Sequence, residues 1–485
     1  MDAAAFLDAL RSPAALAVLE IAWVLGASVW MLLERRSPAA TLAWILALAV
    51  IPILGVPVYL ALGPRRLRRK KLRMALARRT IGPALEAWER ATAAQLDRSG
   101  QLMRLATRLD AGPPERARSL SLYADGDDCY RAMLEAVAAS RDHVHAEYYI
   151  VEPDRVGTRF RDALAAAARR GVSVRLLVDA AGSARLSRRF LAPLLAAGAR
   201  FARFNPVFHQ RLGQRIANFR THRKILVVDG RVGFTGGVNV CDHHSRAASG
   251  EGAWRDTHLR IEGAAVHGLQ ATFLENWSFA TRRSGWTGSL DDLRRRYFPP
   301  DDGGDEVVQI VASGPDQDIP AIEALYFAAL AGARERVWIT TPYFVPGEPM
   351  AEALASAALR GVDVQLLLPV RSDSRIVDAA GRTFHDDLVA AGAKIHLYGP
   401  PMVHAKTCVV DRDLAIVGSA NIDSRSMRLN FEVVAAIYGG QAVAGLAALF
   451  EGDRARARTK GWLEAGEPAG RRLFASAARL LAPQL

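Results

Sequence analysis

The chain has 485 residues, half of them hydrophobic, which predicts two to four domains with large cores. Its formal net charge of +13 predicts a polyanionic partner, either nucleic acid or an anionic membrane. The three cysteines are odd in number, far apart and without the spacing of metal ligands, so we expect neither a disulfide framework nor a zinc site.

Two apolar segments near the N-terminus predict a transmembrane helical hairpin. Residues 14–33 contain Glu20 as their only charged residue, and residues 40–62 contain none. Each segment has the roughly 20 residues that a helix needs to cross the hydrocarbon core. A cleaved signal peptide is the alternative for the first segment, but acidic residues precede it and a second span follows at once. We therefore expect the polyanionic partner to be an anionic membrane rather than nucleic acid.

A dense run of arginine and lysine follows the second apolar segment, at residues 65–73. The positive-inside rule places this end of the hairpin in the cytoplasm, and two spans then place the N-terminus there too. Such a run also attracts anionic lipid headgroups, although its role could be limited to setting the topology. We expect residues 1–63 to form the hairpin and residues 64–117 to form a basic, helical linker.

The remaining chain contains one unit twice, predicted as lobes at residues 118–300 and 301–485. Each unit reads as alternating strands and helices followed by a histidine-bearing strand and its partner, which is typical of a layered α/β lobe. Each carries the motif His-x-Lys-x-x-x-x-Asp and then a small-residue turn ending in asparagine. The motif residues are His222, Lys224, Asp229 and Asn239 in the first unit, and His404, Lys406, Asp411 and Asn421 in the second. Because duplicated lobes usually pack face to face, we expect one pseudo-twofold seam at which neither motif is a complete site.

Two histidines delivered in this way suit displacement at phosphorus, because one imidazole can attack while the other protonates the leaving oxygen. The lysines strengthen this interpretation, since only six of the 63 basic residues are lysine and two of them hold the same place in both motifs. A compact ammonium is not equivalent to a guanidinium fork, so the pattern indicates a site that needs a point charge. The alternative is that two buried strands carry these residues by chance, which fits the repeated strand-and-turn context less well.

These residues resemble the phospholipase D superfamily and, within it, the bacterial membrane-bound cardiolipin synthases. The resemblance covers nearly the whole chain and includes the paired spans, the basic run, both motifs, WRDTH at residues 254–258 and GSANIDSRSMRLNFE at residues 418–432. It implies two phospholipase D-type α-β-α lobes behind an N-terminal transmembrane hairpin. It also implies a two-step displacement at a phosphodiester that uses no metal and no other cofactor.

The resemblance further implies a role for each motif residue. His222 is assigned as the nucleophile and His404 as the general acid and base, although the equivalence of the motifs means that the sequence cannot distinguish them. The non-bridging oxygens and the charge that develops on them would be held by the remaining polar side chains, Lys224, Lys406, Asn239 and Asn421.

Four carboxylates accompany the motifs. Glu432 and Asp256 would each orient a histidine through its second ring nitrogen, with a surface or core salt bridge as the alternative for both. Asp229 and Asp411 belong to the motifs, but they stand where strands lead into turns. We expect them to cap those turns or pair with a neighbouring base rather than to take part directly in the chemistry.

Other polar and aromatic residues have simpler interpretations. We expect His143 and His145 to be surface or packing residues. Cys241, His243 and His244 follow the first turn but lack the spacing of metal ligands, so no metal site is predicted. Four aromatic residues at equivalent strand ends either line the mouth of the seam or pack in the cores, namely Tyr148, Tyr149, Tyr343 and Phe344.

The leading functional hypothesis is cardiolipin synthesis from two phosphatidylglycerol molecules at the bacterial inner membrane, with multi-pass anchoring and cytoplasmic lobes. Its partners would be phospholipids and the anionic membrane surface, with no nucleic acid. Close alternatives are the same fold with another donor or acceptor, or a hydrolase that uses water to give phosphatidic acid. A nuclease would gain little from two spans, and two complete motifs argue against a binding protein with an inactive site.

Overall fold

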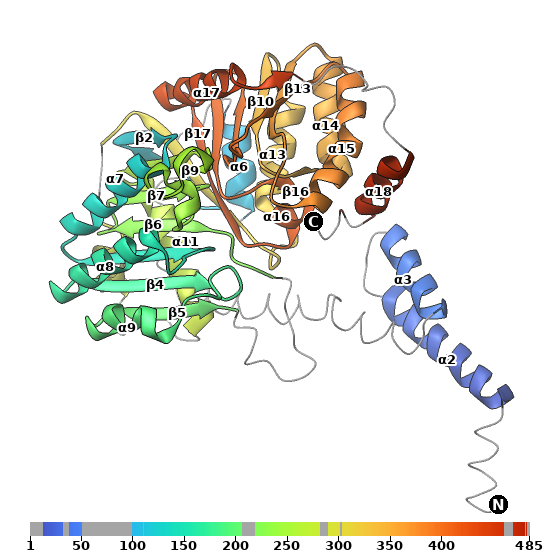
Figure 1. Cartoon of the computed structure of the whole chain (residues 1–485), viewed down its shortest axis with the longest axis horizontal. Coiled ribbons are helices and arrows are strands. Elements are labelled where there is room, and N and C mark those ends of the chain that lie inside the picture. Colours follow the sequence, from blue (N-terminus) through green and yellow to red (C-terminus); the bar gives the residue numbers. More distant parts are fainter. Residues whose placement is uncertain are drawn as a thin grey trace, which may run out of the picture. The chain divides into compact units, whose positions relative to one another are not determined.

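The computed structural model describes residues 13–32, 38–50, 99–109, 111–205, 219–281, 290–300, 303–459, 469–480 and 482. Contacts within the chain divide it into two compact units. The first unit holds the two N-terminal helices, and the second holds every described element from Gly100 onward (Figure 1).

The N-terminal unit consists of α2 (Pro13–Leu32) and α3 (Pro38–Val50), which pack against each other. Met31 and Leu48 are fully buried between them. Other apolar side chains of both helices are exposed, including Val18, Ile21, Leu25, Leu42 and Leu46. Among the described residues, no helix combines the length and the hydropathy that crossing a membrane requires. The end of the second predicted span and the whole basic run lie outside the described residues.

The first lobe is built on a seven-stranded sheet. In sheet order, its strands are β2 (Ser119–Tyr123), β8 (His258–Glu262), β7 (Val232–Gly236), β6 (Lys224–Val228), β3 (His143–Tyr148), β4 (Ser173–Asp179) and β5 (Arg200–Phe204). Strands β3, β4 and β5 are parallel, whereas β6, β7, β8 and β2 are antiparallel to their neighbours. One face carries α7 (Gly126–Ala139), α8 (Arg155–Arg169) and α9 (Arg188–Ala196). Alternate residues of β3 point to the other face, where α11 (Val266–Thr281) packs.

The second lobe repeats this arrangement in a nine-stranded sheet. In sheet order, its strands are β1 (Glu115–Ala117), β9 (Glu306–Ser313), β17 (Glu432–Tyr438), β15 (Leu414–Gly418), β14 (Thr407–Val410), β10 (Arg336–Thr340), β12 (Asp363–Pro369), β13 (Lys394–Tyr398) and β18 (Arg458–Thr459). The order from β9 to β13 matches the order from β2 to β5 in the first lobe, strand for strand. The prediction of two repeated α/β lobes is therefore confirmed.

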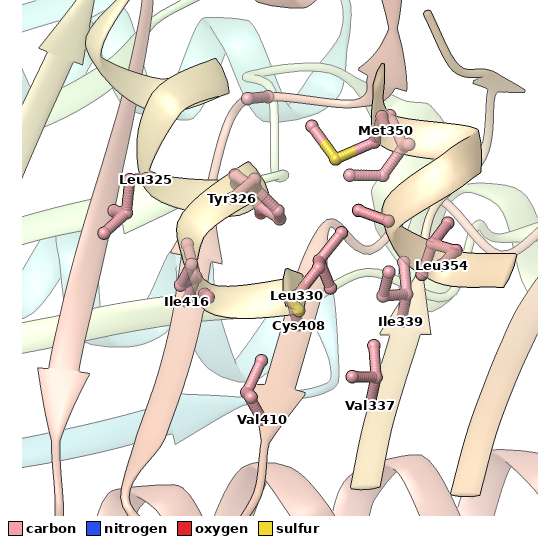
Figure 2. Packing of buried hydrophobic residues seen from close by; sticks show 14 of the residues in the cluster. Leu325, Tyr326, Leu330, Val337, Ile339, Met350, Leu354, Cys408, Val410 and Ile416 are labelled. Atoms are coloured by element: carbon pink, nitrogen blue, oxygen red, sulfur yellow. The ribbon is translucent and has the colours of Figure 1, made fainter. Parts of the chain in front are cut away.

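Helices cover both faces of the second sheet. On one face lie α13 (Ala321–Ala331), α14 (Glu348–Leu359) and α15 (Arg375–Ala390). Figure 2 shows their contact with the strands, where Tyr326, Leu330 and Leu354 pack over Ile339, Cys408 and Ile416. On the other face, α17 (Gly440–Arg454) stacks Phe450 on Trp338. Helix α11 of the first lobe contacts β9 of the second lobe, and α17 of the second lobe contacts β2 of the first. These two helices therefore lie between the sheets of the two lobes.

Shorter elements complete the described chain. They are η1 (Asp242–His244), α10 (Arg246–Ser249), η2 (Gly250–Gly252), α12 (Leu290–Tyr297), the parallel pair β11 (Phe344–Val345) and β16 (Ile422–Asp423), α16 (Ser424–Arg428) and α18 (Ala469–Arg479).

The end of the segment predicted as a linker belongs structurally to the second lobe. Helix α6 (Gly100–Arg108) packs against α13 and buries Met103 and Ala106 in the second-lobe core. Strand β1 pairs antiparallel with β9. The side chain of Gln309 in β9 also binds this segment, because its Nε2 donates hydrogen bonds to the carbonyl oxygens of Met103 in α6 and of Gly112 beyond it. The chain therefore contributes to the second lobe before it builds the first.

The motif aspartates hold loops at the far ends of the histidine strands. Asp229 and Asp411 adopt left-handed backbone conformations, with φ of 53° and 51°. Asp229 accepts hydrogen bonds from the backbone N–H groups of residues 141–143, and Asp411 accepts them from residues 334–336. Each stands seven residues beyond its histidine, about 20 Å along an extended strand. Both aspartates thus occupy turn-capping positions away from the histidines, as their place in the motif suggests.

We expect Asp229→Ala and Asp411→Ala to lower stability without changing the chemistry. Each change leaves three N–H groups without a charged acceptor and places alanine at positive φ, a loss of about 2–3 kcal/mol. Thermal unfolding should therefore shift to a lower temperature, while turnover per folded molecule stays close to wild type. Asp→Asn is the matched control, since asparagine tolerates this backbone conformation and keeps one acceptor. Unchanged unfolding with lost turnover would contradict the structural role.

Candidate active site

The structure brings the two motifs together where the lobes meet. Each histidine lies just before the strand that follows it, β6 or β14, and is held there by the backbone of the other lobe. The N–H of His222 donates to the carbonyl oxygen of Phe431 (2.9 Å), and the N–H of His404 donates to that of Arg255 (2.7 Å). Short parallel bridges join Thr221 to Phe431 and Arg255 to Val403.

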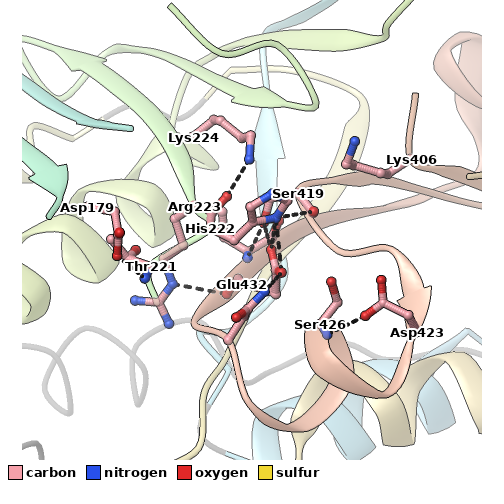
Figure 3. Close-up of polar contacts among 12 residues, drawn as sticks. Asp179, Thr221, His222, Arg223, Lys224, Lys406, Ser419, Asp423, Ser426 and Glu432 are labelled. Carbon is pink, nitrogen blue, oxygen red and sulfur yellow. Dashed lines mark hydrogen bonds and ion pairs between the residues drawn. The ribbon is translucent and has the colours of Figure 1, made fainter. Parts of the chain in front are cut away.

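His222 is oriented by a carboxylate of the second lobe. Its Nδ1 lies 3.1 Å from Glu432 Oε2 and 3.1 Å from the carbonyl oxygen of Ser419 (Figure 3). The Ser419 hydroxyl donates to the same carboxylate at 2.5 Å, which fixes Glu432 in place. The ring of Tyr149 meets the imidazole edge-on, with centroids 4.9 Å apart. These contacts occupy Nδ1 and leave Nε2 as the nitrogen that can react.

His404 is oriented by a carboxylate of the first lobe. Its Nδ1 lies 2.7 Å from Asp256 Oδ2, and the other oxygen of Asp256 accepts a hydrogen bond from the Thr257 N–H. Asp256 fits here because Gly237 has no side chain, since a Cβ at that position would overlap the carboxylate. The indole of Trp254 packs on the His404 ring, with centroids 5.0 Å apart. Each motif histidine is therefore positioned by the opposite half of the chain.

Burial controls the protonation of both histidines in the empty site. It lowers the pKa of His222, while Glu432 opposes this effect. It lowers the pKa of His404 further, and the neighbouring Lys406 and Lys224 act in the same direction. Both imidazoles are consequently neutral near pH 7, as a nucleophile must be. A phosphate anion placed beside them would favour the protonated form that a general acid needs.

The two motif lysines are both buried, and a charge on one disfavours a charge on the other. Lys224 Nζ donates to the carbonyl oxygen of His222 at 2.7 Å, and Lys406 Nζ lies 3.0 Å from Nδ1 of His404. Burial lowers the pKa of Lys224 to about 7, and repulsion by Lys406 adds to this shift. Burial also lowers the pKa of Lys406 to about 8, although nearby carboxylates oppose the change. A bound oxyanion would favour the charged form of both lysines, so the site is suited to an anion.

We expect oxyanion binding to take up protons at mildly alkaline pH. Both lysine pKa values lie below the ordinary 10.5, so between about pH 7 and pH 10.5 the folded enzyme binds fewer protons than the unfolded chain. The free energy of unfolding therefore increases as pH rises through this range. A bound anion raises both pKa values. Tungstate should therefore bind more weakly as pH rises from 6 to 9, and calorimetry at pH 8 in buffers of different ionisation enthalpy should detect proton uptake.

The matched variant for this measurement is Lys224→Met, which keeps the length of the stem and removes one titrating group. We expect it to weaken tungstate binding and to reduce the proton uptake. Affinity that does not change with pH in the wild-type enzyme would contradict a role for the lysines in holding the anion.

The two motif asparagines are both buried. The side-chain oxygen of Asn239 accepts a hydrogen bond from the Ile150 N–H at 3.3 Å. The side-chain oxygen of Asn421 has no hydrogen-bond partner among the described residues. Binding of phosphate oxygens by their amide groups stays a prediction.

The remaining predicted residues separate into packing and seam positions. His143 and His145 are buried packing residues, since both bind Gln270 and His145 stacks on Phe273. Strand alternation divides the aromatic pairs, with one member buried in the core and the next only partly exposed. The buried members are Tyr148 and Phe344, and the partly exposed members are Tyr149 and Tyr343.

Sequence reasoning missed Ser419 and the special role of Gly237. These residues hold the same position in the two turns, and each contacts the carboxylate of its own lobe. A serine supports Glu432, whereas a glycine makes room for Asp256. The signal was present as one of the two differences between GGVN and GSAN, but only the structure shows what faces that position.

Comparison with known proteins supports the family resemblance that the sequence motifs indicate. A family model described as "Cardiolipin synthase, PLD-like domain" matches residues 133–255 and 326–454, and one described as "Phospholipase_D-nuclease N-terminal" matches residues 21–64. Cardiolipin synthase 1 of Bacillus anthracis is 38% identical over 438 residues, which cover 89% of this chain and 86% of that protein. A cardiolipin synthase of Geobacillus thermodenitrificans (strain NG80-2) is 38% identical over 463 residues, covering 93% and 90%.

A solved structure extends the comparison to the fold. The crystal structure of phosphatidylserine synthase from Haemophilus influenzae Rd KW20 superposes with a TM-score of 0.61 over 79% of this chain and 100% of that one, at 13% identity. At that identity, the likeness supports the two-lobed fold alone. The family matches fall on both lobes, and the relatives align along most of their own length. The chain therefore belongs to the bacterial cardiolipin synthases of the phospholipase D superfamily.

Proposed function

We propose that this enzyme transfers a phosphatidyl group from one phosphatidylglycerol to the terminal hydroxyl of a second, giving cardiolipin and glycerol. The observation that carries the proposal is the exchange of carboxylates, since each motif histidine is held through Nδ1 by the other lobe. Two reactive Nε2 atoms and two buried ammonium groups can then act on one phosphodiester. The resemblance to cardiolipin synthases supports a phospholipid substrate.

In the first step, His222 Nε2 attacks phosphorus and forms a phosphohistidine. The bond from phosphorus to the glycerol oxygen breaks as protonated His404 donates its Nε2 proton to that oxygen. Lys224 and Lys406 stabilise the charge that develops on the non-bridging oxygens. Because the incoming phosphate is itself an anion, it opposes the burial and the lysine repulsion that keep His404 neutral in the empty site.

In the second step, a hydroxyl of another phosphatidylglycerol gives its proton to His404 Nε2, and its oxygen attacks phosphorus. The bond from phosphorus to His222 breaks, and both histidines return to their starting states. The phosphohistidine conserves the reactivity of the original ester, so no nucleotide is consumed. Water in place of the second lipid would give phosphatidic acid.

We also propose that residues 14–33 and 40–62 form a hairpin that anchors the enzyme in the bacterial inner membrane, with the lobes in the cytoplasm. Two observations support the anchor: the exposed apolar side chains of α2 and α3, and the N-terminal family match at residues 21–64. The cytoplasmic side follows from the positive-inside rule applied to the basic run at residues 65–73. Extraction of membranes with alkaline carbonate should leave the full chain in the pellet. Its release into the supernatant would contradict the anchor.

Product analysis by mass spectrometry tests the proposed reaction. The purified full chain is added to phosphatidylglycerol vesicles, and the lipids and free glycerol are measured. We expect cardiolipin and glycerol in equal amounts. Phosphatidic acid without cardiolipin would make the enzyme a hydrolase, and no product from folded protein would direct attention to another donor, such as phosphatidylethanolamine, or to a nucleic acid.

A further inference from the structure

A third histidine lies in the reaction centre without a role in the two-step displacement. His244 ends η1, just beyond the turn that follows β7, and its side chain is fully buried. Its Nδ1 lies 3.4 Å from Asp256 Oδ2, the oxygen that holds His404. Its ring meets the His404 ring at a steep angle, with centroids 5.3 Å apart. His244 therefore stands beside Asp256 and His404, the carboxylate and imidazole of the proposed acid and base group.

The position of His244 is fixed by its backbone, but its ring nitrogens are not paired. The carbonyl group of His244 packs so closely on Gly126 that a Cβ there would overlap it. Neither ring nitrogen has a hydrogen-bond partner among the described residues. Leaving a buried polar group unpaired costs about 1–3 kcal/mol, so the nearby carboxylate oxygen is the natural acceptor for its proton.

The surroundings favour a neutral, proton-donating imidazole over the other options. Burial lowers the pKa of His244 well below its ordinary value, so the ring carries one N–H at neutral pH. A metal ion bound by His244, Asp256 and His404 would have to replace the 2.7 Å hydrogen bond between the last two. It would also face Lys224 and Lys406, whose charge opposes a cation.

We propose that His244 is a positioning residue that acts through Asp256 on His404. In the working enzyme its Nδ1–H donates to Asp256 Oδ2, which lies 3.4 Å from it in this structure, and holds that oxygen in line with Nδ1 of His404. This contact fixes the tautomer of His404, so that Nε2 is the atom that exchanges protons with the substrate. The inference deepens the proposed function and rests on it for the role of His404. It makes the acid and base group a chain of three side chains, as Ser419, Glu432 and His222 are on the other side of the site.

Two substitutions separate hydrogen bonding from packing. His244→Phe keeps a flat ring but has no donor, whereas His244→Asn places an amide N–H near the position of Nδ1 and has no ring. We expect the phenylalanine variant to lower kcat roughly 10- to 100-fold with KM nearly unchanged. This is the size of effect seen when a residue that orients a functional histidine from behind is removed. The asparagine variant should recover most of the loss. Recovery by phenylalanine and not by asparagine would show a packing role and overturn the proposal.

A double-mutant cycle tests whether His244 acts through Asp256. Turnover of phosphatidylglycerol is followed as release of glycerol, with the full chain in mixed micelles. His244→Phe should have a large effect in the wild-type background and less than about a threefold effect when combined with Asp256→Asn. Equal effects in both backgrounds would overturn the inference. The exposed neighbour His243 provides the matched control, and His243→Phe should stay within about twofold of wild type.

This readout distinguishes the inference from the proposed function. Glycerol is released whether the acceptor is a second lipid or water, so the cycle can be measured even if no cardiolipin forms. Absence of cardiolipin would then contradict the proposed function alone, and an additive cycle would contradict the role of His244 alone. Unfolding temperatures of all variants confirm that the compared proteins are folded.

Discussion

His222→Ala is expected to abolish phosphatidyl transfer, with a loss of about 10⁴-fold or more in kcat, because no covalent intermediate can form. His404→Ala should cause a similar loss on phosphatidylglycerol, whose glycerol oxygen must be protonated as it departs. The two variants differ on a lipid with a p-nitrophenyl leaving group, which departs without a proton. On that substrate His404→Ala should still release p-nitrophenolate in a first turnover, whereas His222→Ala should not.

This pair of substrates also decides which histidine is the nucleophile. Burial lowers the pKa of both histidines and the two lysines add to this effect, but only at His222 does a carboxylate, that of Glu432, oppose it. The empty site therefore does not by itself favour His404 as the acid. If His222→Ala, and not His404→Ala, retains the burst of p-nitrophenolate, the two roles are reversed. A phosphohistidine trapped by acid quenching and located by peptide mass spectrometry gives the same answer directly.

Glu432→Gln and Asp256→Asn are expected to lower kcat by about 10²- to 10⁴-fold, with little change in lipid binding. Each amide presents an N–H where the imidazole Nδ1–H needs an acceptor, so the neighbouring histidine adopts the wrong tautomer. The exchange of partners makes the two changes distinguishable. Glu432→Gln should impair formation of the phosphohistidine at His222 even with the p-nitrophenyl lipid, although the change lies in the other lobe.

Asp256→Asn should resemble His404→Ala and retain the burst with the p-nitrophenyl lipid. The nearby exposed Glu251→Gln is the control for loss of a carboxylate in the same loop region. If each carboxylate instead affected the histidine of its own lobe, the two phenotypes would be interchanged, and the partner exchange seen in the structure would not describe the working enzyme.

Much of the architecture could be predicted because the duplication is visible in the amino-acid sequence. His222 and His404 recur with the same lysine, aspartate and asparagine, and equivalent strands recur around them. A repeated pattern implies a repeated fold, so the lobes and their meeting point follow from it. The positions of Glu432 and Asp256 could be recognised, but which histidine each one serves could not. That choice depends on how two lobes pack, and packing leaves no periodic signal in the sequence.

The same limit explains what was missed near the site and at the start of the lobes. His244 lacks the spacing of a metal ligand, and its relation to Asp256 depends on a turn that brings η1 back over the motif. Residues 99–117 read as a helical linker because their partner strand, β9, comes only after the whole first lobe. Local composition contains no information about such a distant partner. The domain boundaries and the membrane hairpin stay predictions.

The early pairing of β1 with β9 has a consequence for synthesis at the ribosome. Strand β1 and helix α6 leave the ribosome before the first lobe, yet the sheet and core that they join are completed only when the second lobe has emerged. The strands of the first lobe can therefore pair with one another during synthesis, whereas β1 has no partner strand until β9 has been made. When β9 has been synthesised and pairs with β1, segments from before and after the first lobe join in one sheet, and this pairing links the two lobes. A nascent chain stalled before Glu306 thus holds one finished lobe, half of a reaction centre and an open strand that only its own C-terminal half can cover.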